Sequence, residues 1–239
     1  RVTDQFMQAV VNGKEWQTKA VTTGEVIDTY KAKDLLQMIA EATHACGDPG
    51  LQFDTTINTW HTCPNSGRID ASNPCSEYMF LANSSCNLAS LNLMRFRQEN
   101  SEFDVESFLH AVHIIIIAQE ILVDNSSYPN ELITANSHRF RPLGLGYTNL
   151  GALLMASGLP YDSEAGRAYA AVIAALMSGQ AYKTSALLAQ TEGPFEGYAL
   201  NREPMLNVIR KHLHPLARID RAQAPDVLCT AAQQTWQHA

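Results

Sequence analysis

The feature that most constrains the fold is a long segment in the middle of the chain, residues 48–87, that follows neither a helical nor a strand period. Prolines and glycines interrupt it throughout: Pro49, Gly50, Pro64, Gly67 and Pro74. A loop of this length inside a compact domain is usually functional. Without a helix or sheet, its backbone N–H and C=O groups need other hydrogen-bond partners, which makes such a loop costly to keep. We therefore expect helices and strands on either side of one long functional loop.

Within this segment, Asn73-Pro74-Cys75-Ser76-Glu77 places an amide, a thiol and a carboxylate at alternating positions, and a second thiol follows at Cys86. Proline fixes its own φ and disfavours the α region for the residue before it, so the stretch is predicted to be extended. Alternate residues of an extended chain share a face, which would point Asn73, Cys75 and Glu77 the same way. A carboxylate beside a thiol disfavours the thiolate, so the pattern favours one-electron over nucleophilic chemistry.

Periodicity predicts regular elements on both sides of the loop. Before it we expect a helix at 4–11, two strands within 15–31 around a Thr23-Gly24 turn, and a helix at 34–46 that ends at Gly47. After it we expect a buried strand at 88–93 and a helix at 105–123, with a strand at 112–118 as the alternative. Further helices are predicted in the second half at 149–156, 164–190, 204–213 and 224–236.

The composition bounds the class of protein. With 239 residues and 46% hydrophobic content, the chain can bury a core as one domain or two small ones. A net charge of −7 without a block of like charges argues against a nucleic-acid partner. The longest apolar stretch, around 114–118, is too short to span a bilayer, so no membrane partner is expected. The chain starts at Arg1 within a helical pattern, which reads as a piece of a longer protein.

The cysteines indicate thiols rather than a disulfide framework or a metal site. The five cysteines include no C-x-x-C pair and no secretory leader precedes them, which favours a reducing cytoplasm. Cys63, Cys75 and Cys86 lack the short ligand pairs of zinc modules, so no metal is expected. Cys46 is interpreted as a buried structural thiol.

The glycine pair in Gly144-Leu-Gly146 is not a dinucleotide fingerprint, because the third glycine and a preceding strand are missing. It indicates a tight approach between backbone segments before the helix at Asn149. Arg139 and Arg141 are expected to be solvated or paired with carboxylates, without a catalytic role.

Several motifs in one order resemble a known family. The stretch from Asn73 to Leu81 (NPCSEYMFL) and the stretch from Cys86 to Leu93 (CNLASLNL) resemble the finger loop of ribonucleotide reductases, most closely the adenosylcobalamin-dependent (class II) enzymes. The segments 47–58, 60–68, 139–146 and 193–198 are also similar to that family. The resemblance therefore covers almost the whole chain.

The resemblance implies a role for each residue of the loop. Cys75 would become the thiyl radical that removes the 3′ hydrogen atom of a ribonucleotide, and Glu77 would take the proton of the 3′ hydroxyl. Asn73 would hydrogen-bond the ribose hydroxyls, with Ser72 beside it and Glu77 also in contact with the substrate. Cys86 would be one of two thiols that reduce the substrate and end as a disulfide. No cysteine upstream of Cys46 matches its partner, so the segment is not expected to turn over alone.

At the level of the fold, the resemblance implies an α/β protein: residues 1–239 as a single partial segment of a ten-stranded barrel, helix-rich in its second half, with the finger loop at about 61–87. His61 and Cys63 would line the pocket under Asp54 and Asn58. It also implies an adenosylcobalamin cofactor, ribonucleoside diphosphate substrates and a thioredoxin-type reductant, and leaves a homodimer open. The alternatives are a class I reductase catalytic subunit, whose radical comes from a metal-containing partner, and a non-catalytic helical interaction fragment.

Overall fold

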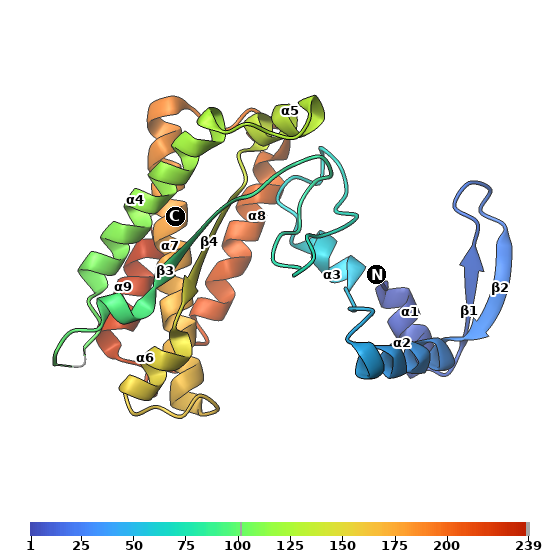
Figure 1. Ribbon diagram of the computed structural model, residues 1–239, viewed down its shortest axis with the longest axis horizontal. Coiled ribbons are helices and arrows are strands. Elements are labelled where there is room, and N and C mark those ends of the chain that lie inside the picture. The colour runs from blue at the N-terminus through green and yellow to red at the C-terminus, as the bar shows by residue number, and fades with distance from the viewer. Residues whose placement is uncertain (101, 238–239) are drawn as a thin grey trace. The chain divides into compact units, whose positions relative to one another are not determined.

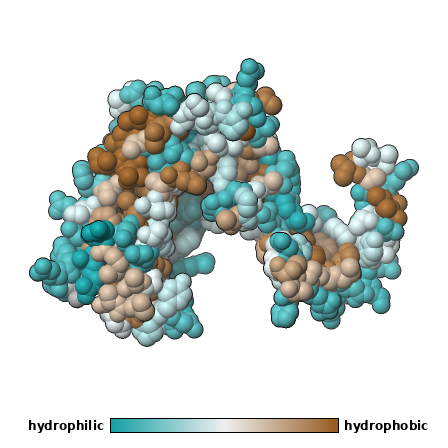
Figure 2. Space-filling model, viewed as in Figure 1, coloured by the Kyte–Doolittle hydropathy of each residue, from teal (hydrophilic) through white to brown (hydrophobic). Residues whose placement is uncertain are grey.

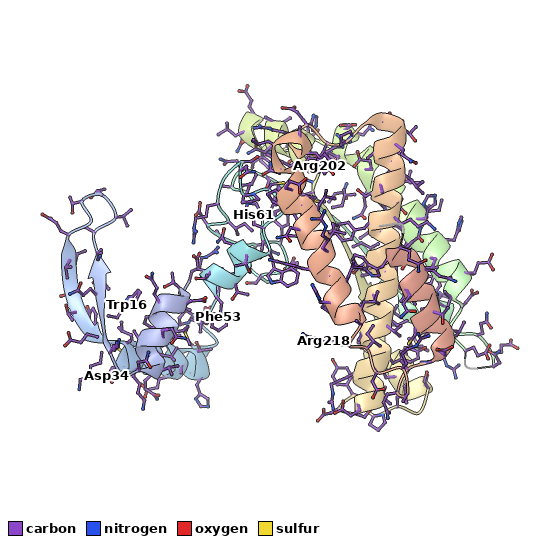
Figure 3. All side chains as sticks on the ribbon, turned by 180° about the vertical axis from the view of Figure 1, so that it is seen from behind. Trp16, Asp34, Phe53, His61, Arg202 and Arg218 are labelled. Carbon is purple, nitrogen blue, oxygen red and sulfur yellow. The ribbon has the colours of Figure 1, made fainter. Side chains whose placement is uncertain are left out.

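A computed structural model describes residues 1–100 and 102–237, and these residues form two compact units, the first ending at His61 and the second beginning at Thr62. The first unit contains α1 (Asp4–Val11), β1 (Glu15–Lys19), β2 (Val26–Lys31), α2 (Ala32–Cys46) and α3 (Asp54–Thr59). β1 and β2 form an antiparallel hairpin. Trp16 on β1, labelled in Figure 3, belongs to this hairpin. Its ring packs edge-on against that of Phe6 of α1, with centroids 5.3 Å apart, and so joins the hairpin to the helices.

The sequence predicts most of this unit correctly. Thr3 caps α1, since its hydroxyl accepts a hydrogen bond from the backbone N–H of Phe6, and α2 ends at Gly47 in the left-handed conformation. Two points differ. The short helix α3 lies inside the segment predicted to be a loop. Cys46 is exposed rather than buried, and its thiol donates to the carbonyl of Ala42 in the turn before it.

The second unit contains a parallel pair of strands, β3 (Asn87–Asn92) and β4 (Leu143–Thr148), which run side by side in Figure 1. Leu88 pairs with Gly144 in their register. Parallel strands need a long crossover, and here it contains α4 (Val105–Asn125) and α5 (Glu131–Phe140). The sequence predicts β3 and α4, so the alternative of a strand at 112–118 is wrong. The predicted burial of β3 is also wrong, since its residues alternate between half-buried and exposed and Leu88 is 63% exposed. It misses α5 and β4, whose glycines weaken the strand pattern.

The remaining elements of this unit are η1 (Leu93–Phe96), α6 (Leu150–Ala156), α7 (Glu164–Glu192), α8 (Tyr198–Leu216) and α9 (Asp226–Trp236). The core forms where α4, α7 and α9 meet over β3 and β4 (Figure 1). Phe108 and Val112 of α4 and Ile173 of α7 are fully buried there. Each such side chain contributes about 1.5–3 kcal/mol by leaving water, so this helical face holds the strand pair in place.

Helix α4 is more apolar than a usual surface helix. By length and composition alone it meets the criterion for crossing a membrane, whereas the apolar stretch around 114–118 by itself predicts no such span. One face packs into the core, whereas Ile114, Ile121 and Leu122 are exposed, and Figure 2 shows hydrophobic residues gathered along this helix. The buried side chains of α4 lie along the one face that packs against α7 and the strands.

Helix α8 starts six residues before Pro204, the position at which the sequence predicts a start. A proline inside a helix leaves the carbonyl four residues earlier without its N–H donor. Here that carbonyl belongs to Leu200, and the side-chain amide of Asn65 donates to it at 2.8 Å. A contact from a distant loop thus compensates for the proline, which local sequence cannot reveal.

The described residues form two two-stranded sheets and a helix-rich second unit. The mixed α/β class and the helical second half are therefore confirmed. The described strands do not show the ten-stranded barrel that the resemblance implies.

Candidate functional site

The loop that carries the predicted reactive residues makes a tight turn instead of an extended strand. The N–H of Ser76 donates to the carbonyl of Asn73 at 3.1 Å, which closes a turn with Pro74 and Cys75 at its centre. Proline suits the second position of such a turn because its φ is already correct. The predicted alternation of side chains on one face is therefore wrong. The turn places the exposed Cys75 at the tip.

Polar side chains on both sides stabilise this turn. Ser76 has a φ of 64°, a left-handed conformation that is costly for a residue other than glycine. The hydroxyl of Ser72 donates to the carbonyl of Asn73 at 2.8 Å and lies 3.3 Å from the hydroxyl of Ser76. The side-chain oxygen of Asn73 accepts from the N–H of Tyr78 at 3.0 Å. Among the described residues the amide nitrogen of Asn73 has no acceptor, so its donor side is available to a ligand hydroxyl.

Tyr78 connects the turn to the segment that ends at Cys86. Its backbone N–H reaches Asn73, and its hydroxyl lies 2.7 Å from the hydroxyl of Ser84. Burial raises the pKa of Tyr78 to about 12, so the phenol stays protonated and can donate. Tyr78 therefore links the turn at Asn73 to Ser84, two residues before Cys86.

The pKa of the Cys86 thiol is raised by its surroundings. Burial is the main cause that raises the pKa of Cys86 to about 11, and the negative charge of Glu77 raises it further. Glu77 is exposed and, among the described residues, accepts no hydrogen bond, so its carboxylate is available as a base. The sequence argument that a carboxylate keeps a loop thiol protonated thus applies to Cys86.

Helices anchor the loop at both ends. At its start, the fully buried Asn201 of α8 accepts from the N–H of Asn65 at 2.9 Å and donates to the hydroxyl of Ser66 at 2.8 Å. At its end, the hydroxyl of Ser85 lies 2.8 Å from that of Ser137 on α5. Because buried polar groups are costly to leave unpaired, these bonds fix where the loop enters and leaves the core.

Cys86 immediately precedes β3 and lies against β4. Gln119 of α4 is 2% exposed, and its side-chain nitrogen donates to the carbonyls of Asn87 at 2.8 Å and Gly144 at 2.9 Å. One amide therefore clamps the two strands together next to the thiol. Gln119 directly follows the apolar stretch around 114–118. Its spacing from Val112 and Ile116, which puts a polar group on the buried face of the helix, could have identified it.

The predicted tight approach at the glycine pair is confirmed at Gly144. A Cβ atom there would lie 2.5 Å from Leu88 Cδ2 and 2.9 Å from Cys86 Sγ. Gly144 approaches β3 and the thiol of Cys86, because its own segment is the strand β4, which pairs with β3.

The predictions for the flanking residues are less successful. Cys63 is buried in a small core with Leu81 and Phe140. Asp54 is buried and paired with Arg1 at 2.8 Å, so its charge already has a partner.

Two further observations concern charged groups. Arg141 is confirmed as an ion-pair residue, since it binds Glu120 and Asp124. Within the part of the chain that the structure describes, no group of three or more His, Cys, Asp or Glu side chains could hold a metal ion.

Comparison with known proteins identifies the family. The model of the family described as "Ribonucleotide reductase, barrel domain" matches residues 1–239. The chain belongs to this family. It is 52% identical over 238 residues to the "Vitamin B12-dependent ribonucleotide reductase" of Rhodopirellula baltica and 49% identical over 244 residues to that of Streptomyces clavuligerus. A "Vitamin B12-dependent ribonucleoside-diphosphate reductase" of Mycobacterium tuberculosis is 34% identical over 201 residues, 84% of this chain and 29% of the relative. The chain is covered to 99% in the first two comparisons but spans 23% and 25% of those relatives.

Proposed function

We propose that the chain is a segment of the catalytic chain of an adenosylcobalamin-dependent ribonucleotide reductase, which converts ribonucleoside diphosphates to 2′-deoxyribonucleotides. The observation that carries the proposal is the identity of about half of all residues, over nearly the whole chain, to relatives named as vitamin B12-dependent reductases. The choice of diphosphates follows the name of the more distant Mycobacterium tuberculosis relative. In the full protein this segment would contribute to the ten-stranded barrel, and a thioredoxin-type protein would return electrons to it.

The roles proposed for the loop residues agree with their positions. Cys75, exposed at the tip of the turn, would remove the 3′ hydrogen atom as a thiyl radical. The exposed carboxylate of Glu77 would take the proton of the 3′ hydroxyl, a contribution of about 10²–10⁴-fold for a positioned base. The donor side of Asn73 would bind a ribose hydroxyl, next to Ser72.

Cys86 would supply electrons together with a second thiol of the full protein. A thiol with a pKa of about 11 is protonated at neutral pH, so it can deliver hydrogen as well as electrons. It would leave each turnover as one half of a disulfide, which the external reductant reopens.

We take the cofactor to be adenosylcobalamin because the relatives that share about half of their residues with this chain are named vitamin B12-dependent. When bound, the cofactor supplies a radical by breaking its cobalt–carbon bond. This chain offers the thiol of Cys75 as the exposed hydrogen-atom donor, on a turn that Ser72 and Asn73 stabilise from within.

The test is an anaerobic assay of the full-length parent protein with ribonucleoside diphosphates and a dithiol reductant. Deoxynucleotide formation is expected with adenosylcobalamin and not without it. Equal activity with a di-metal partner protein and no cobalamin would overturn the proposal in favour of a class I reductase.

A further inference from the structure

Cys86 lies against a strand position that has no side chain. Gly144 does not have a positive φ, so its backbone conformation does not require glycine. The neighbouring side chains do require glycine at this position. An added Cβ would lie 2.9 Å from Cys86 Sγ and 2.5 Å from Leu88 Cδ2, closer than real Cβ atoms approach other atoms. Gly146 lies two residues along the same strand and hence on the same face, yet a Cβ there would meet Ser90 Oγ at 3.6 Å, an ordinary contact.

The backbone around Gly144 cannot move aside to relieve this crowding. Gly144 is paired with Leu88 in the parallel ladder, and Gln119 ties the carbonyl of Gly144 to that of Asn87 from the buried side. The side chains must therefore yield. Leu88 is 63% exposed and can turn into solvent, but the sulfur of Cys86 moves only by changing its single χ1 rotamer.

We propose that Gly144 is a positioning residue for the Cys86 thiol: its missing side chain keeps open the space that Sγ occupies beside the loop. The proposal rests on the proposed function, in which Cys86 reduces the substrate and then forms a disulfide. Two sulfurs must approach to about 2 Å with a defined torsion to form that bond, so the rotamer of Cys86 decides whether reduction can finish.

The test compares Gly144→Ala with the matched control Gly146→Ala in the full-length parent protein. Gly144→Ala is expected to lower deoxynucleotide formation by about 10²-fold, the cost of misplacing a reacting group by about 1 Å. Cofactor-dependent release of tritium from the substrate 3′ position, which needs Cys75 and not Cys86, is expected to persist. Gly146→Ala should leave both signals unchanged.

A second readout does not depend on turnover. The pH dependence of Cys86 alkylation, measured by peptide mass spectrometry, is expected to shift in Gly144→Ala and not in Gly146→Ala, because the sulfur leaves its half-buried place. If Gly144→Ala fails to fold, Leu88→Ala combined with Gly144→Ala removes the closer clash and leaves the contact with Sγ. The same losses are expected from that variant, and Leu88→Ala alone is its control.

Normal deoxynucleotide formation by Gly144→Ala, or equal losses in both glycine variants, would overturn the positioning role. Full deoxynucleotide formation by Cys86→Ser would instead overturn the proposed function. In that case the alkylation measurement would still decide whether Gly144 sets the position of the thiol.

Discussion

Replacing Gln119 by methionine should loosen the strand pair that holds Cys86 while keeping the shape of the core. The change removes two hydrogen bonds, at 2.8 and 2.9 Å, to the carbonyls of Asn87 and Gly144. Such bonds contribute about 0.5–1.5 kcal/mol each, and carbonyls left unpaired in a core cost more. The side-chain oxygen of Gln119 is buried without a partner among the described residues, so its removal offsets part of the loss. The net cost is about 2 kcal/mol, or about a 30-fold larger opening constant.

Hydrogen exchange read by mass spectrometry on the peptide that contains β3 measures this opening directly. The control is Gln180→Met, which removes another buried glutamine from the same core but touches Thr184 of α7 and not the strands. We expect faster exchange of β3 in Gln119→Met alone. Unchanged exchange in that variant, or the same acceleration in both variants, would refute the view that this amide clamps the two strands.

Two further predictions concern charges. Glu77→Gln should lower the pKa of Cys86 from about 11 but leave it above the ordinary thiol range, because burial is the larger cause. The pH dependence of Cys86 alkylation measures this pKa. An unchanged pKa would contradict the effect of the Glu77 charge on the thiol. Arg141→Met should lower the melting temperature, because Glu120 and Asp124 lose their shared partner. Arg141 holds the pKa of Asp124 below its usual range, so the difference between variant and parent should be full above about pH 4 and shrink as the pH falls through that lowered pKa. A difference that is independent of pH in this range would argue against the ion pair.

The sequence predicts those elements whose signals are local. Thr3 caps α1, Gly47 ends α2, and the apolar period places α4 and α7, so local capping and patterning were sufficient there. The prediction fails where a distant group decides. Helix α8 continues through Pro204 because Asn65 supplies the missing donor.

In the candidate site, too, the sequence predicts some features and misses others. The residue types and their order around Cys75 identify the chemistry, but the geometry differs from the extended strand that Pro74 suggests. A backbone bond from Ser76 to Asn73 closes a turn instead, and the side chains of Ser72 and Asn73 stabilise it. Local side-chain hydrogen bonds of this kind compete with extended structure. The spacing of Gln119 could have placed it on the buried face of α4, but not named its partners, because these are backbone groups of strands on either side of its helix in the chain.

The most direct test of the account is tritium release from the 3′ position of the substrate in Cys75→Ser and Cys86→Ser of the full-length protein, each with adenosylcobalamin under anaerobic conditions. Cys75 sits at the exposed tip of the turn, whereas Cys86 is half-buried at the start of β3. We predict no release from Cys75→Ser, since a serine hydroxyl cannot replace the thiol as hydrogen-atom donor. We predict that Cys86→Ser retains release without forming deoxynucleotide, because reduction fails after the first step. Release retained by Cys75→Ser would contradict the assignment of the radical thiol.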